Sequence, residues 1–408
     1  MIQFLFNWFI SKTIRRAVDL VKTVRKITRS QRDLLKPEAI TAIDEVCRTL
    51  ELATHGPRDI GRVRELMKEV EKVANANLQP YPNAAMRENF EVALVAIGVA
   101  LGIRTFFLQP FKIPTGSMQP TLYGITHQDY RTQPDEKFPT GFERWVDSWF
   151  RGVSYYEVIA EESGKLTQVE EPRSVLLPFI KKQRFQVGSK TYTVWFPPDE
   201  LFGDRYGRFG GRAGLHPEQY FEKGEPILKL KVVSGDHLFV DRMTYNFRPP
   251  HRGEIVVFAT EGIYGLPQDQ YYIKRLVGLG SETLSIDNSR HVHVDGQRLD
   301  AATDRFEFVY GFGAQPPLDS HFSGHVNGQV ATAYGHAYSL APLFPTEDET
   351  FTIRTNHLFV LGDNTVNSLD SRAWGDFTRT NVIGKSAFVY WPFLGGSDRD
   401  SRFGWSHR

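Results

Sequence analysis

The sequence of 408 residues has only one cysteine, Cys47. A single cysteine can neither close a disulfide within the chain nor build a metal cluster, so neither constraint shapes the fold. Its neighbours Ile43, Val46 and Leu50 recur at helical spacing, and we therefore expect Cys47 to pack on the buried face of a helix. A reactive thiol would need an accessible, electropositive environment, which such an apolar face does not offer.

The chain also lacks a net charge of either sign, since 49 basic residues stand against 48 acidic ones. Composition therefore gives no argument for a nucleic-acid partner, and we expect none. The charge is uneven along the chain, however, because eight basic residues and the single acid Asp19 lie between Lys12 and Arg32. Such a segment suits anionic lipid headgroups at least as well as nucleic acid.

Histidines are few and are not arranged as metal ligands. His291 and His293 could share one face of a strand, and His321, His325 and His336 lie near one another in the sequence. No carboxylate or cysteine stands beside either group at ligand spacing. We therefore expect neither a metal nor a cofactor.

Residues 1–80 are predicted to be α-helical and cytoplasmic. Met1–Ile10 is apolar, but it is about half the roughly 20 residues of a spanning helix, and it lacks the charge order of a secretory signal. From Ile10 to Val24, apolar residues at helical spacing oppose a basic face, which fits either a helix on a membrane surface or one packed on its neighbours. Two more helices are expected at about 37–53 and 58–76, ahead of a boundary at 79–82.

One long apolar run follows, and nothing later in the chain is comparably apolar. Val92–Ile103 has no polar side chain, and Arg104 is the one charge before Leu108. The run reaches the lower length limit for a membrane span, and Arg104 can extend its charge to the interface. We predict one transmembrane helix at 90–108; the alternative is a buried helix of a soluble core.

Residues 109–408 change to short β-like runs separated by glycine and proline, so we predict a mainly β domain. Asp295-Gly296 is expected to form the turn of a hairpin. Two long stretches, about 124–230 and about 300–350, read as irregular insertions. The expected strands are His237–Arg242, Glu254–Thr260, Tyr271–Gly278, His291–Val294, Leu358–Leu361 and Ala387–Trp391.

Residues Phe111–Leu122 read FKIPTGSMQPTL. Pro114 and Pro120 bracket a Gly-Ser pair, so Ser117 is expected in a loop or strand end with constrained geometry. Because it follows the apolar helix closely, its hydroxyl would lie near the bilayer surface. A serine in such a loop is usually a turn residue, and the alternative reading is a nucleophile.

Residues Gln270–Gly278 read QYYIKRLVG. In a strand, Lys274 shares a face with Tyr272 and Arg275 shares the other with Ile273, so one of two adjacent cations must point toward apolar side chains. An apolar site favours a neutral lysine, because desolvation penalises the charged form, and a neutral amine can act as general base to a serine. The alternative is an exposed strand with both cations in solvent.

Residues Leu361–Trp374 read LGDNTVNSLDSRAW, a turn-rich loop in which Asp370 and Arg372 could pair.

Taken in order, the apolar helix, GSMxPTL, GEIVVF, YIKRxVGL and GDNxxNSxDSR resemble the type I signal peptidases. The resemblance covers roughly residues 90–122, 234–300 and 356–392. It implies a signal-peptidase-like, mainly β catalytic domain, preceded here by the helical region and one transmembrane helix.

The resemblance also implies the roles of individual residues. Ser117 matches the nucleophile and Lys274 the general base. Thr115 matches a hydroxyl donor of the oxyanion hole, which it would share with the Ser117 backbone N–H. Ser368 matches a serine that hydrogen-bonds and orients the lysine. Asp370 and Arg372 match an ion pair that supports the site.

Three departures from the family pattern lie outside the Ser/Lys pair. Thr365 and Val366 replace Arg and Asp in the last motif, so the loop after Asn364 is expected to be held differently. Gly280, Ser281 and Glu282 follow Leu279 in place of the usual Pro-Gly-Asp. Glu254 stands where Asp is common.

The resemblance implies cleavage of exported preproteins after small residues in an A-x-A pattern. The implied partners are signal peptides, the phospholipid membrane and the secretion machinery. The implied location is the cytoplasmic membrane, with a single pass and the catalytic domain on the extracytoplasmic side; Arg87 is the one basic residue close before the helix. Two other readings are a repressor-type Ser/Lys peptidase and a catalytically silent membrane scaffold.

Overall fold

The computed structural model describes residues 11–57, 59–79, 84–133, 135–175, 177, 180–203, 210–311, 323–336, 338–395 and 401–405. The chain divides into two compact units, Met1–Gly98 and Val99–Arg408. The predictions for Met1–Ile10, for the boundary at 80–82 and for His321 lie outside the described residues.

The first unit contains three helices that pack on one another. They are α2 (Lys12–Ser30), α3 (Pro37–His55) and α4 (Ile60–Asn77). Ser11 and Asp59 cap α2 and α4 by accepting backbone N–H bonds, which satisfies donors that a helix start leaves free.

The apolar face of α2 is covered by its neighbours. Ala17, Val21 and Val24 belong to one buried cluster with Ile43 and Cys47. The packed-helix alternative for this segment is therefore correct, and the apolar face is not available for a membrane surface. Cys47 is fully buried on α3, as predicted.

Helix α5 (Ala84–Phe106) is the one helix of the described chain that is long and apolar enough to cross a membrane. Its apolar part, Glu88–Phe106, has no buried residue. Val92, Val95 and Val99 are each more than half exposed. An apolar helix exposed on all sides does not fit the alternative of a core helix in a soluble protein.

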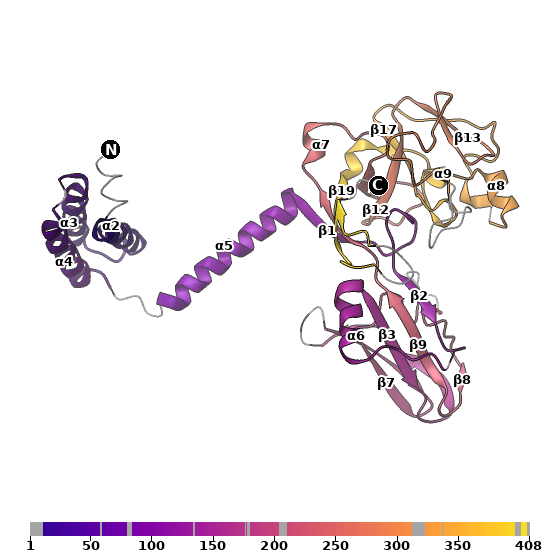
Figure 1. Ribbon diagram of the computed structural model, residues 1–408, viewed down its shortest axis with the longest axis horizontal. Helices are drawn as coiled ribbons and strands as arrows, with labels where there is room; N and C mark the ends of the chain where they lie inside the picture. Colours follow the sequence, from indigo (N-terminus) through magenta and orange to yellow (C-terminus); the bar gives the residue numbers. More distant parts are fainter. Residues whose placement is uncertain are drawn as a thin grey trace. The chain divides into compact units, whose positions relative to one another are not determined.

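The centre of the second unit is an antiparallel eight-stranded sheet that contains most of the predicted strands (Figure 1). Its order is β1-β10-β19-β11-β12-β17-β18, with β20 paired to β19. Its strands are β1 (Leu108–Lys112), β10 (His237–Asp241), β11 (Ile255–Ala259), β12 (Tyr271–Leu279), β17 (His357–Leu361), β18 (Phe377–Thr378), β19 (Val382–Trp391) and β20 (Gly404–Trp405).

Both faces of this sheet are covered. Alternate residues of β11 enter different clusters, because successive side chains of a strand point to opposite faces. Val257 packs with Ile113 and Met118, whereas Val256 packs with Val360. The segment that carries Ser117 therefore lies against one face of the sheet.

A second sheet, in the order β15-β14-β13-β16, contains the predicted hairpin. Asp295 and Gly296 have φ of 49° and 78° between β14 and β15. These are the positive values that a two-residue hairpin turn requires, so the hairpin prediction is confirmed. The strands are β13 (Thr283–Ile286), β14 (Val292–Val294), β15 (Gln297–Arg298) and β16 (Phe351–Thr352).

The sequence predicted an irregular insertion at 124–230, and this prediction is wrong. The stretch forms β-structure with its own core. In Figure 1, β2, β3, β7, β8 and β9 lie together and apart from β12, β17 and β19. Phe185, Phe221 and Leu230 are buried in its core. Its elements are β2 (Thr126–Asp129), α6 (Gly141–Val146) with a π-helical turn (Asp147–Arg151), β3 (Val153–Ile159), β4 (Gly164–Val169), β5 (Arg173–Ser174), β6 (Lys181–Val187), β7 (Lys190–Trp195), β8 (Tyr220–Phe221) and β9 (Pro226–Val233).

The stretch 300–350 has little regular structure among its described residues. Helix α8 (Gly328–Ala333) is capped by Asn327, whose side chain accepts from the Val330 N–H. A 3₁₀ turn (Tyr338–Leu340) follows. The remaining short helices are α7 (Thr244–Phe247), α9 (Ser371–Trp374) and the 3₁₀ turns Thr365–Asn367 and Arg379–Asn381.

Candidate active site

Ser117 lies in the segment between β1 and β2 and is almost completely buried. Its side chain is 5% exposed, and the following Met118 is fully buried in the core. Asn364 holds this segment from the far loop: its N–H donates to the Ser117 carbonyl oxygen at 3.0 Å, and its Nδ2 donates to the Gly116 carbonyl oxygen at 3.0 Å. The serine is therefore positioned by two hydrogen bonds from Asn364, one to its own carbonyl oxygen and one to that of Gly116.

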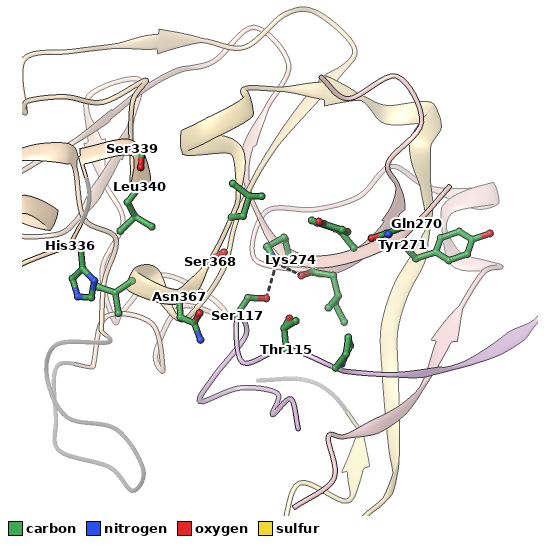
Figure 2. A pocket seen from close by; sticks show the side chains of 15 residues that line it. Thr115, Ser117, Gln270, Tyr271, Lys274, His336, Ser339, Leu340, Asn367 and Ser368 are labelled. Carbon is green, nitrogen blue, oxygen red and sulfur yellow. Dashed lines mark hydrogen bonds between the residues drawn. The ribbon is translucent and has the colours of Figure 1, made fainter. Parts of the chain in front are cut away.

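Lys274, on β12, reaches this serine. Its Nζ donates to Ser117 Oγ at 2.8 Å and to the Ile273 carbonyl oxygen at 3.0 Å (Figure 2). It also lies 5.6 Å from the centre of the Tyr272 ring, and the residue is 4% exposed. The two residues that the sequence proposed as a pair are thus brought together across 157 positions of the chain.

Arg275, the next residue of β12, is also buried, on the opposite face. Its guanidinium forms two hydrogen bonds to the Asp363 carboxylate, Nε to Oδ1 at 2.7 Å and Nη2 to Oδ2 at 2.6 Å. Both side chains have no exposed surface. Sequence reasoning expected one of the two cations to be buried and missed this ion pair. The one sequence signal for this pair was the aspartate of Gly-Asp-Asn, Asp363, which could have indicated a partner for Arg275.

Asp370 and Arg372 form a second fully buried ion pair, as the turn-rich loop suggested. Nε and Nη2 of Arg372 donate to the two carboxylate oxygens at 2.9 and 2.8 Å. Burial alone would raise the pKa of Asp370, but the Arg372 charge holds that pKa below its usual value. The Gly362 N–H also donates to Asp370, at 3.1 Å. The pair therefore fixes the loop that follows β17.

The departures at 365 and 254 are explained by their contacts. Arg372 Nη1 donates to Thr365 Oγ1 at 2.8 Å and Nη2 to the Thr365 carbonyl oxygen at 2.7 Å, so this threonine ties the loop to the ion pair. Burial raises the pKa of Glu254, but hydrogen bonds from Arg248 and the His251 N–H lower it to about 2. The longer acid, itself buried, thus reaches the partly exposed guanidinium of Arg248.

In the remaining departure, at residues 280–282, Glu282 holds the turn after β12. Its Oε2 accepts from the Leu279 N–H, at 2.6 Å, and its carboxylate pairs with Arg252 at 2.6 Å. Ser281 has a φ of 73°, a conformation that a non-glycine residue seldom adopts. The departures therefore change how the turn is held and leave the serine and the lysine in contact.

Ser368 and Thr115 both line the pocket that contains Ser117. The Ser368 hydroxyl is buried, and the expected hydrogen bond to Lys274 is not formed here. The hydroxyl instead interacts with the Asp370 carboxylate and helps to lower its pKa. Thr115 is half-buried and lies beside Ser117 in Figure 2. The Ser117 N–H donates to no acceptor within the described part of the chain.

The pocket itself is a cleft of about 660 Å³. One end is lined by Gln270 and by Tyr271–Ile273 of β12, and the other by residues that sequence reasoning did not assign to the Ser117 site. His336, Ser339 and Leu340 come from the stretch 300–350. No signal in the sequence placed them here, since neither local pattern nor resemblance reached that stretch.

No group of three potential metal ligands exists among the described residues. The histidines named above have other partners: His293 bonds Asp287 at 2.9 Å, and His325 bonds the Tyr310 hydroxyl at 2.9 Å. His336 lies at the cleft instead. The arrangement is that of a hydroxyl paired with a buried amine, a combination found in serine hydrolases that use no histidine.

Comparisons with known proteins agree with this class. The family model described as "Signal peptidase, peptidase S26" matches residues 86–138 and 228–391. The gap between the two matched ranges falls within the extra β-structure. The chain therefore belongs to the signal peptidase family, peptidase S26.

Individual relatives point the same way. Signal peptidase I of Leptolyngbya laminosa is 30% identical over 45% of this chain and 72% of its own length. Signal peptidase I of Bacillus caldolyticus is 28% identical over 43% of this chain and 79% of its own. A probable signal peptidase I-2 of Synechocystis is 28% identical, over 41% of this chain and 59% of its own.

A solved structure, signal peptidase I of Enterococcus faecalis V583, matches 34% of this chain and 97% of its own, at 20% identity and a TM-score of 0.23. The assignment rests on the sequence matches. Members of this family are serine endopeptidases that remove signal peptides. This membership favours an enzyme over the scaffold and over a repressor-type peptidase.

Proposed function

We propose that this chain is a membrane-anchored signal peptidase in which Ser117 is the nucleophile and neutral Lys274 the general base. The observation that carries the proposal is the 2.8 Å contact between Lys274 Nζ and Ser117 Oγ in a cleft. Both side chains are almost fully buried, and burial of an amine favours its neutral form because the charged form loses hydration.

With the amine neutral, the hydrogen bond reverses and the serine hydroxyl donates to Lys274 Nζ. Ser117 Oγ then attacks the scissile carbonyl carbon while Nζ takes its proton. The proton passes from Nζ to the leaving amine, and an acyl-enzyme remains on Ser117. The Lys274 amine next takes a proton from water, whose oxygen attacks the acyl carbon. The bond from that carbon to Ser117 Oγ then breaks, Nζ returns the proton to Oγ, and the signal peptide leaves.

The negative charge on the carbonyl oxygen requires donors. The Ser117 N–H, without an acceptor in the described chain, and the Thr115 hydroxyl are both beside the nucleophile. A backbone and a side-chain donor of this kind stabilise the tetrahedral intermediate more than the ground state. We assign Thr115 this role. Ser368 lines the cleft without a hydrogen bond to Lys274, and the Asp370–Arg372 pair holds the loop after β17 that carries it.

The edge of β12 offers a place for the substrate. β12 pairs with β11 through Tyr271–Arg275, but β17 begins to pair only at Arg275. On that side Tyr271–Ile273 line the cleft. An extended signal peptide added as a strand here would place alternate side chains in the cleft wall, which fits small residues at the first and third positions before the cut.

Helix α5 would anchor the protein in the cytoplasmic membrane, with a single pass and the helical unit inside. The length and apolarity of α5 support the anchor. The charge rule supports the orientation only in part, because the basic segment of α2 lies far along the chain from α5 and Arg87 is the one basic residue close before the helix. Protease added to intact spheroplasts should then digest the unit after α5 and spare residues 11–79. Protection of both units would contradict this topology.

The substrate assignment is tested by incubating the detergent-solubilised full chain with a model preprotein and measuring both product masses. We expect a single cut after A-x-A. Replacing the alanine before the cut by leucine should reduce cleavage by about 10-fold to 200-fold, because one side-chain pocket discriminates by about 1–3 kcal/mol. Equal cleavage of both preproteins would contradict the A-x-A specificity.

A further inference from the structure

The cleft has a second wall that the sequence motifs of the Ser117–Lys274 site do not include. His336, Ser339 and Leu340 line it and come from the stretch after α8. In Figure 2, Gln270 and Tyr271 lie on one side of the Ser117–Lys274 pair, and these three residues lie on the other. The catalytic atoms therefore separate the β12 edge from this second wall.

The second wall is tied to the catalytic loop. The Val326 N–H donates to Thr365 Oγ1 at 2.9 Å, and Arg372 Nη1 donates to the Val326 carbonyl oxygen at 3.1 Å. On the far side, the Leu343 N–H donates to the Arg372 carbonyl oxygen at 3.2 Å. The segment is thus anchored at both ends to the residues that support the site.

Buried residues fix the wall as well. Val326, Ala331 and Ala341 have no exposed surface. Because close-packed interiors resist displacement, these buried residues hold the neighbouring residues of the wall in one geometry. The exposed side chains of His336 and Ser339 are therefore presented to the cleft from a fixed support.

The chemistry of this wall is that of a hydrogen-bond donor surface. An imidazole, a hydroxyl and the amide of Asn367 line this end of the cleft. None of the fifteen residues that line the cleft is aspartate or glutamate. Donors without a competing carboxylate suit an acidic group, since hydrogen bonds to a charged partner are the stronger ones.

The position of the wall says which part of the substrate meets it. If the signal peptide occupies the β12 edge, its carbonyl reaches Ser117 from that side, and the chain beyond the cut continues toward the opposite side. We propose that His336 and Ser339 form a binding site for the first residues of the mature protein and favour an acidic side chain there. This inference rests on the proposed function.

The test uses three model preproteins that are identical except for Glu, Gln or Lys at the second residue after the cut. Wild-type full chain in detergent should show a kcat/KM about tenfold higher for Glu than for Lys, the effect of one charge-assisted hydrogen bond. His336→Ala with Ser339→Ala should bring that ratio close to one, and His336→Gln, which keeps a donor, should restore part of it. His216→Ala removes an exposed histidine of the extra β-structure and should leave the ratio unchanged.

Equal rates for Glu and Lys in the wild type, or a ratio that survives the double substitution, would overturn the inference while leaving the signal peptidase assignment intact. A wild-type protein that cleaves none of the three preproteins would instead contradict the proposed function and this inference together. The two failures are therefore distinguishable within one experiment.

Discussion

Adjacent Lys274 and Arg275 show how two cations can be buried for different purposes. They lie on opposite faces of β12, and each finds a partner from a distant segment, Ser117 for the lysine and Asp363 for the arginine. The alternation of a strand predicts the opposite faces. It cannot predict the partners, because these are set by loops more than 80 residues away.

The Arg275–Asp363 pair makes a stability prediction. Asp363→Ala should lower the free energy of unfolding by about 3–5 kcal/mol, because it leaves the arginine charge buried without its partner. The double variant Arg275→Met with Asp363→Leu should recover much of the loss, since it buries no charge. Thermal unfolding of the solubilised protein measures both. A single variant as stable as the wild type would show that the pair is not buried in solution.

The oxyanion role of Thr115 makes a kinetic prediction. Thr115→Val keeps the shape and removes the hydroxyl, so kcat should fall by about 100-fold to 1,000-fold, as for a lost oxyanion donor elsewhere. Thr115→Ser keeps the hydroxyl and should retain most of the activity. If valine and serine act alike, the threonine contributes only packing.

At the scale of elements, the loop after β17 and the Ser117 segment are in close contact at Gly362. A Cβ there would lie 2.1 Å from Ser368 Oγ and 2.5 Å from the Ser117 carbonyl oxygen, far closer than atoms can approach. Only glycine therefore allows the two segments to meet.

Gly362→Ala should push the nucleophile segment away from Lys274. A displacement near 1 Å in a catalytic site can lower the rate by about 100-fold, and we expect a loss of that order in kcat. Gly61→Ala, in helix α4 with its nearest contact at 3.4 Å, is the matched control and should not reduce activity. An active Gly362→Ala enzyme would mean that the two segments are not held together as described.

Predictability from sequence also differed between elements. The strand near 254–260 contains the continuous apolar run Ile255–Ala259, which is the pattern of a strand buried on both faces. The strands of the extra β-structure, such as β6, alternate exposed and buried residues and are interrupted by charged side chains. Because this alternation is short and turn-forming residues surround it, the sequence pattern did not predict strands there.

At the scale of the whole molecule, the apolar helix and the helical first unit follow from composition, but the covering of α2 does not. An amphipathic basic helix has the same sequence pattern on a membrane surface and on two neighbouring helices. The three-helix core around Cys47 decides between them. His336 and Ser339 were also out of reach, because only the folded chain brings the stretch after α8 to the cleft.

Acid should destabilise the second unit in two steps. Glu254, whose pKa is about 2 against an ordinary 4.5, contributes stability that is complete above pH 4.5 and is lost as pH falls toward 2, because the unfolded chain then binds more protons. His325, fully buried, has its pKa lowered by burial from 6.5 to about 3. Below pH 6.5 this histidine binds a proton in the unfolded chain but not in the folded one, so the free energy of unfolding begins to fall there.

Unfolding midpoints measured from pH 7 to pH 3 should show both steps. Glu254→Gln should be less stable at neutral pH and should lose part of the step below pH 4.5, to which Asp370 also contributes, while the step that begins near 6.5 remains. A wild-type midpoint that is constant over this range would contradict both assignments.

The central claim is that Ser117 and Lys274 together perform the cleavage, and the most direct measurement is the cleavage rate of one A-x-A preprotein by wild type, Ser117→Ala and Lys274→Met. We predict that both substitutions lower kcat by at least about 1,000-fold, as loss of a nucleophile or its base does in serine hydrolases, while the thermal unfolding midpoint shows that each variant is folded. A folded Lys274→Met or Ser117→Ala enzyme that still cleaves at the wild-type rate would place the catalytic centre elsewhere.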